Sequence, residues 1–154
     1  MIFETREDIN APIERVFPYI SDFAGFERSA LRRGAEVKRL DTLRQPGAGM
    51  KWDLLFLLRG KRREFQLEMV QYDPPNGMRF HTSTTGVNGV MHVDLIALSR
   101  NSTRMSIKLE MQATNLTGRL LLQSLKLAKS SISGRVKTKL YEFARGTEER
   151  LRSA

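Results

Sequence analysis

The chain has 154 residues, of which 40% are hydrophobic and 28% charged, and it contains no cysteine. These values predict one soluble globular domain over residues 1–154 and exclude disulfides, thiolate nucleophiles and cysteine-ligated metals. The formal net charge is +9, and residues 116–152 carry nine basic and three acidic side chains. This excess favours an anionic partner, although a solvated helix face is the simpler interpretation.

The N-terminus gives no sign of a targeting segment. Residues 1–10 carry acidic side chains and no long apolar stretch, which argues against a signal peptide. The longest strictly apolar run, 54–58, is far too short to span a bilayer. We therefore expect a cytoplasmic protein.

The first part of the chain predicts one strand and two short helices. Residues 2–9 mix Ile, Phe and Thr with charges, which is typical of a strand. Pro12 suits the first turn of a helix, where its missing N–H costs nothing. A second helix is expected over 22–33. Its inward face would carry Phe23, Phe26 and Leu31.

After Gly34 the apolar period changes from helical to alternating, which predicts about six antiparallel strands. Loops rich in Pro, Gly, Asp and Asn separate several of them. The basic run 59–63 is interpreted as a charged hairpin turn. The expected strands are 35–42, 50–58, 64–72, 78–84, 90–98 and 103–111.

From Leu116 the period is helical again, and it predicts a single helix that reaches Arg152. Residues 130–134 are rich in Ser and end in Gly, so either a bend or a close approach to the sheet is expected there. The apolar stripe of this helix comprises Leu121, Leu125, Ala128, Ile132, Val136 and Phe143.

A curled meander of strands needs a cover on its apolar concave face, and only the last helix is long enough to supply one. Five segments carry a resemblance to a known superfamily: 9–17, 21–23, 46–49, 72–75 and 134–140. The chain resembles START/Bet v 1-like (SRPBCC) proteins, and more narrowly their polyketide cyclase/dehydrase-like branch. The resemblance implies an α+β helix-grip fold, in which a curved antiparallel sheet of about seven strands wraps around a long C-terminal helix.

The same resemblance implies a cavity between sheet and helix that holds a hydrophobic molecule. Large flexible or aromatic side chains recur on the inferred concave faces of the strands, which agrees with a lined cavity. A solid core would show the same periodicity, so that alternative stays open. The residues expected to line the cavity are Phe26, Trp52, Leu54, Phe56, Phe65, Leu67, Met69, Phe80, Thr82, Met91, Val93, Met105, Ile107, Leu121, Leu125, Ala128 and Ile132.

Two histidines and one carboxylate are the candidates for other chemistry. If they meet across a hairpin, His81, His92 and Asp94 would suit a metal ion or acid–base work. Strand alternation places His81 on the side opposite Phe80, so ordinary surface residues are the favoured interpretation. The chain has neither a nucleophile elbow nor a phosphate-binding glycine loop. We expect no metal, no cofactor and no catalytic residue that motifs alone identify.

Three leucines and two basic residues form a second face of the last helix, roughly opposite its main stripe. They are Leu116, Leu120, Leu127, Arg119 and Lys126. This face suits a membrane or a second copy of the chain. Packing against the loop around Phe23 and Phe26, or against a neighbouring element, is the simpler expectation.

Three functions follow from these observations. The first is binding of a lipid or polyketide-like molecule in the cavity. The second is a cyclase or dehydratase, which would need a polar group facing the cavity. The third is docking on anionic membranes or acidic proteins through the basic last helix. Nucleic acid is disfavoured as a partner because the basic run 59–63 lacks interleaved aromatics.

Overall fold

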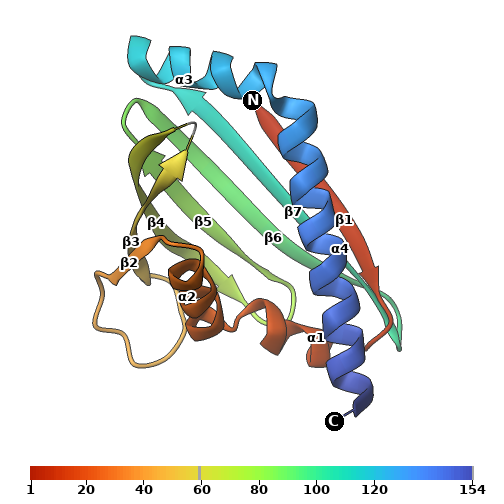
Figure 1. Ribbon diagram of the computed structural model, residues 1–154. Coiled ribbons are helices and arrows are strands. Elements are labelled where there is room, and N and C mark those ends of the chain that lie inside the picture. Colours follow the sequence, from red (N-terminus) through yellow and green to blue (C-terminus); the bar gives the residue numbers. More distant parts are fainter. Residues whose placement is uncertain (59, 154) are drawn as a thin grey trace.

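The computed structural model describes residues 1–58 and 60–153, so Arg59 of the expected basic turn lies outside the described residues (Figure 1). Within these described residues, seven strands and four helices occur in an order that matches the helix-grip expectation. The elements are β1 (Ile2–Ile9), α1 (Ile13–Ile20), α2 (Phe23–Arg32), β2 (Glu36–Arg39), β3 (Lys51–Leu58), β4 (Lys61–Asp73), β5 (Gly77–Thr84), β6 (Val87–Ser99), β7 (Ser102–Ala113), α3 (Leu116–Leu127) and α4 (Lys129–Ser153).

The strands form one antiparallel sheet in the order β1-β7-β6-β5-β4-β3-β2. Successive side chains of a strand point to opposite faces of a sheet. The register therefore sets Trp52, Leu67 and Thr82 in one row that faces the helices. The neighbouring row, with Lys51, Glu68 and His81 among its members, faces outward. Figure 1 shows α2 and α4 on the inner face of the sheet and α3 across its end.

Helix α4 is held mainly through its second half. Its buried residues are Leu140, Ala144, Thr147 and Glu148. The Glu148 carboxylate accepts a hydrogen bond from the backbone N–H of Asn10 at 2.6 Å and pairs with Arg145 at 3.2 Å. Because α4 packs chiefly against the edge strand β1, the middle of the sheet is not filled by this helix.

The expectation of one unbroken helix over 116–152 is wrong, because the chain turns at Ala128 and forms two helices. Leu121 and Leu125 pack with Val87 at the end of the sheet, whereas α4 must run along β1. One straight helix could not pack against both Val87 at the end of the sheet and the strand β1. The expected bend at 130–134 is also absent, since this segment lies inside α4.

The start of α3 is fixed against the β5–β6 turn. The Asn115 side chain accepts a hydrogen bond from the Gly118 backbone N–H at 2.8 Å and caps the helix. A Cβ atom on Gly118 would lie 1.7 Å from the carbonyl oxygen of Gly86, so the two backbones touch directly. Gly86 itself has φ +77°, a conformation that favours glycine. One side of helix α3 is therefore held against the β5–β6 turn.

Within the described residues, no helix is long and apolar enough to cross a membrane.

Candidate functional site

A pocket of about 690 Å³ lies between the inner face of the sheet, α2 and α4. Most of its wall is apolar and comes from inward-facing residues of β3 to β7. The helices add Phe23 and Ala30 from α2, and Leu140 and Phe143 from α4. The pocket exists because α4 packs along the β1 side and α2 stands over the β2 side, so the space between them stays open.

Nine of the seventeen residues predicted to line a cavity lie along this pocket. Strand alternation brings eight of them to the inner face, and α2 supplies the ninth. They are Phe26, Trp52, Leu54, Leu67, Phe80, Met91, Val93, Met105 and Ile107.

The other eight predicted residues lie elsewhere. Phe56 and Phe65 stack on each other with ring centroids 4.5 Å apart, and Met69 is fully buried in the core. Leu121, Leu125 and Ile132 belong to the small cluster beneath α3, and Ala128 ends that helix. Thr82 shares the inward-facing row of Trp52 and Leu67 but is not among the residues that line this pocket. The outward side chains on either side of it belong to a separate groove.

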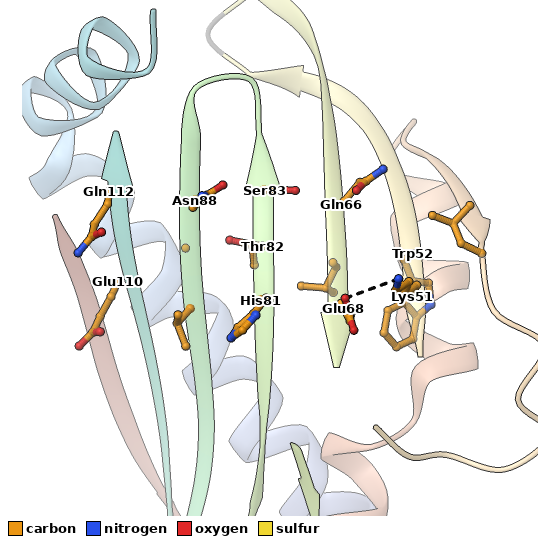
Figure 2. Close-up of a pocket in the computed structure, with 14 residues that line it drawn as sticks. Lys51, Trp52, Gln66, Glu68, His81, Thr82, Ser83, Asn88, Glu110 and Gln112 are labelled. Atoms are coloured by element: carbon orange, nitrogen blue, oxygen red, sulfur yellow. Dashed lines mark ion pairs between the residues drawn. The ribbon is translucent and has the colours of Figure 1, made fainter. Parts of the chain in front are cut away.

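That groove, of about 480 Å³, runs across the outer face of the sheet (Figure 2). Two outward rows of mostly polar side chains flank it, and within one of these rows Lys51 pairs with Glu68 at 3.7 Å. The histidines are not direct neighbours, because His81 lies opposite Val90 and His92 opposite Arg79. Among the residues that the structure describes, no three His, Asp or Glu side chains gather closely enough to hold a metal ion.

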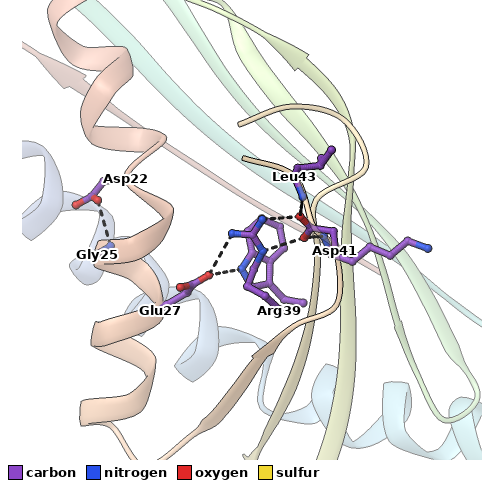
Figure 3. Close-up of polar contacts among 8 residues, drawn as sticks. Asp22, Gly25, Glu27, Arg39, Asp41 and Leu43 are labelled. Carbon is purple, nitrogen blue, oxygen red and sulfur yellow. Dashed lines mark hydrogen bonds and ion pairs between the residues drawn. The ribbon is translucent and has the colours of Figure 1, made fainter. Parts of the chain in front are cut away.

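The inner pocket has a polar corner where α2 meets β2 and β3. Glu27 lines the pocket and accepts a hydrogen bond from the Trp52 indole N–H at 2.7 Å. Figure 3 shows Glu27 pointing toward Arg39, whose guanidinium lies 3.8 Å from the carboxylate and 5.3 Å from the Trp52 ring centre. A carboxylate is thus presented at the wall of an apolar space.

Asp41 fixes Arg39 in this position. Arg39 donates hydrogen bonds of 2.8 and 2.6 Å to the two carboxylate oxygens of Asp41. The backbone N–H groups of Lys51 and Leu43 donate to the same carboxylate. The Arg39 hydrogen bonds, helped by these two backbone donors, hold the pKa of Asp41 well below its usual range. The same pairing raises the pKa of Arg39. Asp41 and Arg39 are therefore both ionised at neutral pH.

Glu27 was not among the predicted site residues, although the sequence held a signal for it. Residues 23, 26, 27 and 30 share one face of a helix by their spacing, so Glu27 is an acid on an otherwise apolar face. The expectation that Leu31 faces inward is wrong, because it is 55% exposed. It lies about 100° around the helix from Ala30, which does line the pocket.

The pocket opens between α2 and α4, where its lining residues are exposed. Phe26 on α2 and Val136 on α4 both line the pocket. Phe26 is 46% exposed and Val136 is 39% exposed. The rings of Phe26 and Phe143 lie 6.1 Å apart, which brings the two helices into contact across this opening. Lys139 and Glu142 pair at 3.6 Å on the α4 side.

A curved antiparallel sheet with helices enclosing an apolar pocket on its inner face defines the helix-grip class of proteins. The chain belongs to the family described as polyketide cyclase / dehydrase and lipid transport, whose model matches residues 2–148. The predicted fold and superfamily are both confirmed. No curated protein matches the chain.

Several solved structures share this fold at low sequence identity. The Zhui aromatase/cyclase from Streptomyces sp. R1128 superposes with a TM-score of 0.70 at 14% identity, covering 98% of this chain and 95% of that protein. Norcoclaurine synthase from Thalictrum flavum gives 0.69 at 11% identity, with 100% and 87% covered. The protein TTHA0849 from Thermus thermophilus gives 0.64 at 18% identity, with 99% and 98% covered. At these identities the similarity shows the fold alone.

Proposed function

We propose that this protein binds a hydrophobic or amphipathic small molecule, of lipid or polyketide type, in the pocket between the sheet, α2 and α4. The observation that carries the proposal is a largely apolar pocket with the Glu27 carboxylate at one corner, an opening beside Phe26, and the Lys139–Glu142 pair on its α4 side. Its volume of about 690 Å³ lies within the ~300–1,000 Å³ that is usual for small-molecule sites. The family's description is consistent with such a ligand.

The nine predicted residues along the pocket supply the apolar contacts in this proposal. Glu27 supplies a polar anchor, because its Oε1 atom takes the Trp52 hydrogen bond and the Arg39 contact, and the described residues place no hydrogen bond on Oε2. A ligand with an apolar body and one hydroxyl or amine group suits this arrangement. Such a group would donate to the carboxylate while the body displaces water from the apolar wall.

Filling the pocket from α2 tests the proposal. Ala30 lines the pocket, whereas Ala24 lies on the exposed side of the same helix. We expect Ala30→Phe to weaken saturable binding of the uncharged fluorophore N-phenyl-naphthylamine at least about tenfold, because the new ring occupies the ligand's space. Ala24→Phe adds the same ring outside the pocket and should bind the fluorophore as the wild type does.

Mass spectrometry of small molecules extracted from the purified protein identifies the natural ligand. The wild type should retain an apolar compound that the Ala30→Phe variant lacks. Absence of both saturable fluorophore binding and any retained compound in the wild type overturns the proposal. Equal binding by the two alanine variants would move the binding site away from this pocket.

A second function, a cyclase acting on a ketide chain, is favoured by the placement of Glu27. A carboxylate at the wall of an apolar pocket is suited to remove a proton from the carbon between two carbonyl groups. The enolate carbon would then bond to a second carbonyl carbon of the same chain, and that carbonyl's oxygen would take up the proton. The apolar wall would hold the chain in the folded geometry that this bond requires.

The variant Glu27→Gln separates catalysis from binding. It keeps the size of the side chain and an acceptor for the Trp52 N–H, but it removes the base. If the protein is a cyclase, cyclisation of a short poly-β-ketone thioester is at least about a hundredfold slower with this variant, while fluorophore binding weakens by no more than the roughly tenfold that one altered hydrogen bond costs. If the wild type does not accelerate the reaction over buffer, the enzymatic proposal fails and the binding proposal stands.

A further inference from the structure

Helix α3 carries apolar side chains on two opposite faces, and the sheet covers only one of them. Leu121 and Leu125 are buried against Val87. Leu116, Leu120 and Leu127 are 68%, 58% and 91% exposed. At about 100° per residue, these three leucines fall within about 40° of one another, on the side away from Leu125.

The exposure of these leucines overturns the expectation that they pack near Phe23 and Phe26. Helix α3 crosses the end of the sheet beside Gly86, whereas α2 stands over the other end (Figure 1). The clamp between Gly118 and Gly86 and the Asn115 cap fix which side of α3 faces outward. The leucine stripe is thus presented to solvent by a rigid attachment.

The charge of the stripe's own helix and of the first half of α4 has one sign. Residues 116–139 contain six basic side chains and no acidic one, and all six are exposed. They are Arg119, Lys126, Lys129, Arg135, Lys137 and Lys139. Arg119 and Lys126 lie about 60–100° from the leucine stripe on the same side of α3, where long side chains reach past it.

We propose that the leucine stripe of α3 and the basic residues of 116–139 dock this protein on an anionic lipid membrane. Leucines on a narrow face flanked by Lys and Arg match the composition of helices that lie in a membrane interface. Anionic headgroups attract the basic residues, and the leucines enter the boundary between headgroups and acyl chains. The helix lies on the membrane and does not span it.

Charge complementarity favours a membrane over a second copy of the chain. A symmetric dimer built on this face would set the same patch against itself. The segment 116–141 offers basic side chains and no acidic one to such an interface, and Glu142, the next acidic residue, already pairs with Lys139. An anionic bilayer neutralises the same charges and accepts the leucines without a shaped pocket.

The docking surface leads to the opening of the pocket. Val136 and Lys139 belong to the basic segment and also line the pocket. A molecule leaving the bilayer would therefore enter the pocket without crossing open water. The docking inference itself stands on the exposed leucines and the charges, so it does not depend on what the pocket binds.

Vesicle co-sedimentation tests the inference. We expect the full-length protein to sediment with vesicles that contain phosphatidylglycerol, to bind phosphatidylcholine vesicles far less, and to bind less as salt is raised. Replacing Leu116, Leu120 and Leu127 together by Ser should weaken binding about a hundredfold. The double variant Arg119→Gln/Lys126→Gln should weaken it about tenfold at low salt.

Matched controls lie elsewhere on the surface. Leu57 is 70% exposed on β3, so Leu57→Ser removes an exposed leucine outside the stripe. The double variant Lys38→Gln/Lys61→Gln removes two exposed charges outside the segment. Both controls should bind vesicles as the wild type does, and far-UV circular dichroism should show every variant folded, because only exposed side chains change.

Three results overturn the inference. The first is no preference of the wild type for the anionic vesicles. The second is equal loss of binding in the stripe variant and in Leu57→Ser. The third is leucine-independent binding to soluble polyglutamate that matches vesicle binding, which would assign the basic residues to an acidic protein. If the stripe variant instead dissociates a dimer in sedimentation velocity and keeps vesicle binding, the stripe is a self-association face.

Discussion

The two helical walls of the pocket are held in different ways. The second half of α4 buries four residues, and its Glu148 carboxylate is hydrogen-bonded to the chain between β1 and α1. Helix α2 has no buried residue and is tied to the sheet through Glu27, Trp52, Arg39 and an aromatic contact with Phe23. One wall is therefore fixed by burial, and the other by polar contacts at its surface.

This difference indicates which wall can move to admit a ligand. Segments with few buried contacts open at lower free energy than the core does. Helix α2 and the first half of α4, which also has no buried residue, flank the opening of the pocket. We therefore expect α2, and not the second half of α4, to be the wall that moves when a ligand enters.

The largest expected effect comes from removing the anchor of α4. Glu148→Ala leaves the Asn10 N–H without its acceptor and Arg145 without its carboxylate partner, so we expect the free energy of unfolding to fall by about 2–3 kcal/mol. Urea denaturation measures this change. Glu149→Ala, at the exposed neighbouring position, should change it by less than about 0.5 kcal/mol. Similar losses in both variants would mean that α4 is not anchored at Glu148.

A smaller and pH-dependent effect is expected at the α2 wall. Asp41→Asn weakens the two charged hydrogen bonds from Arg39, which should lower the free energy of unfolding by about 1–2 kcal/mol near neutral pH. Because the pKa of Asp41 is lower in the folded state than in the unfolded chain, its contribution is present above the unfolded pKa of about 3.9 and is lost as the pH falls below it.

The difference in stability between wild type and Asp41→Asn should therefore shrink as the pH is lowered below about 4. Urea denaturation of both proteins across this range gives the difference directly. Asp8, whose pKa is also lowered by Arg104, is present in both proteins, so its contribution cancels. A difference that is constant with pH would contradict an ionic tie at this wall.

The smallest effect is expected in the exposed first half of α4. A Cβ atom on Gly134 would meet nothing within 4 Å, so Gly134→Ala should stabilise the protein by about 0.5–1 kcal/mol through helix propensity alone. Gly118→Ala is the matched contrast, because its methyl group would clash with Gly86 and should destabilise the protein by about 1–3 kcal/mol. Thermal denaturation should show a higher melting temperature for Gly134→Ala and a lower one for Gly118→Ala than for the wild type.

The sequence allowed the sheet to be predicted because alternation along each strand decides which side chains face inward. Trp52, Leu67, Phe80 and Ile107 follow this rule directly. The break at Ala128 could not be predicted, since 116–127 and 129–153 are both good helices and only their different partners, Val87 and β1, force the turn. The hydrogen bond between Glu27 and Trp52 depends on how α2 packs over the sheet, and local sequence patterns do not predict that packing.

The contact between Phe26 and Phe143 has a consequence for the shape of any guest. The two rings lie at a tilt of 33° at the opening of the pocket. They can rotate about their side-chain torsions alone, on a timescale far faster than helix displacement. A ligand with a narrow alkyl chain can pass between these rings one methylene group at a time. A rigid fused-ring compound requires a displacement of the whole of α2. Its association should therefore be slow even where its affinity for the pocket is high.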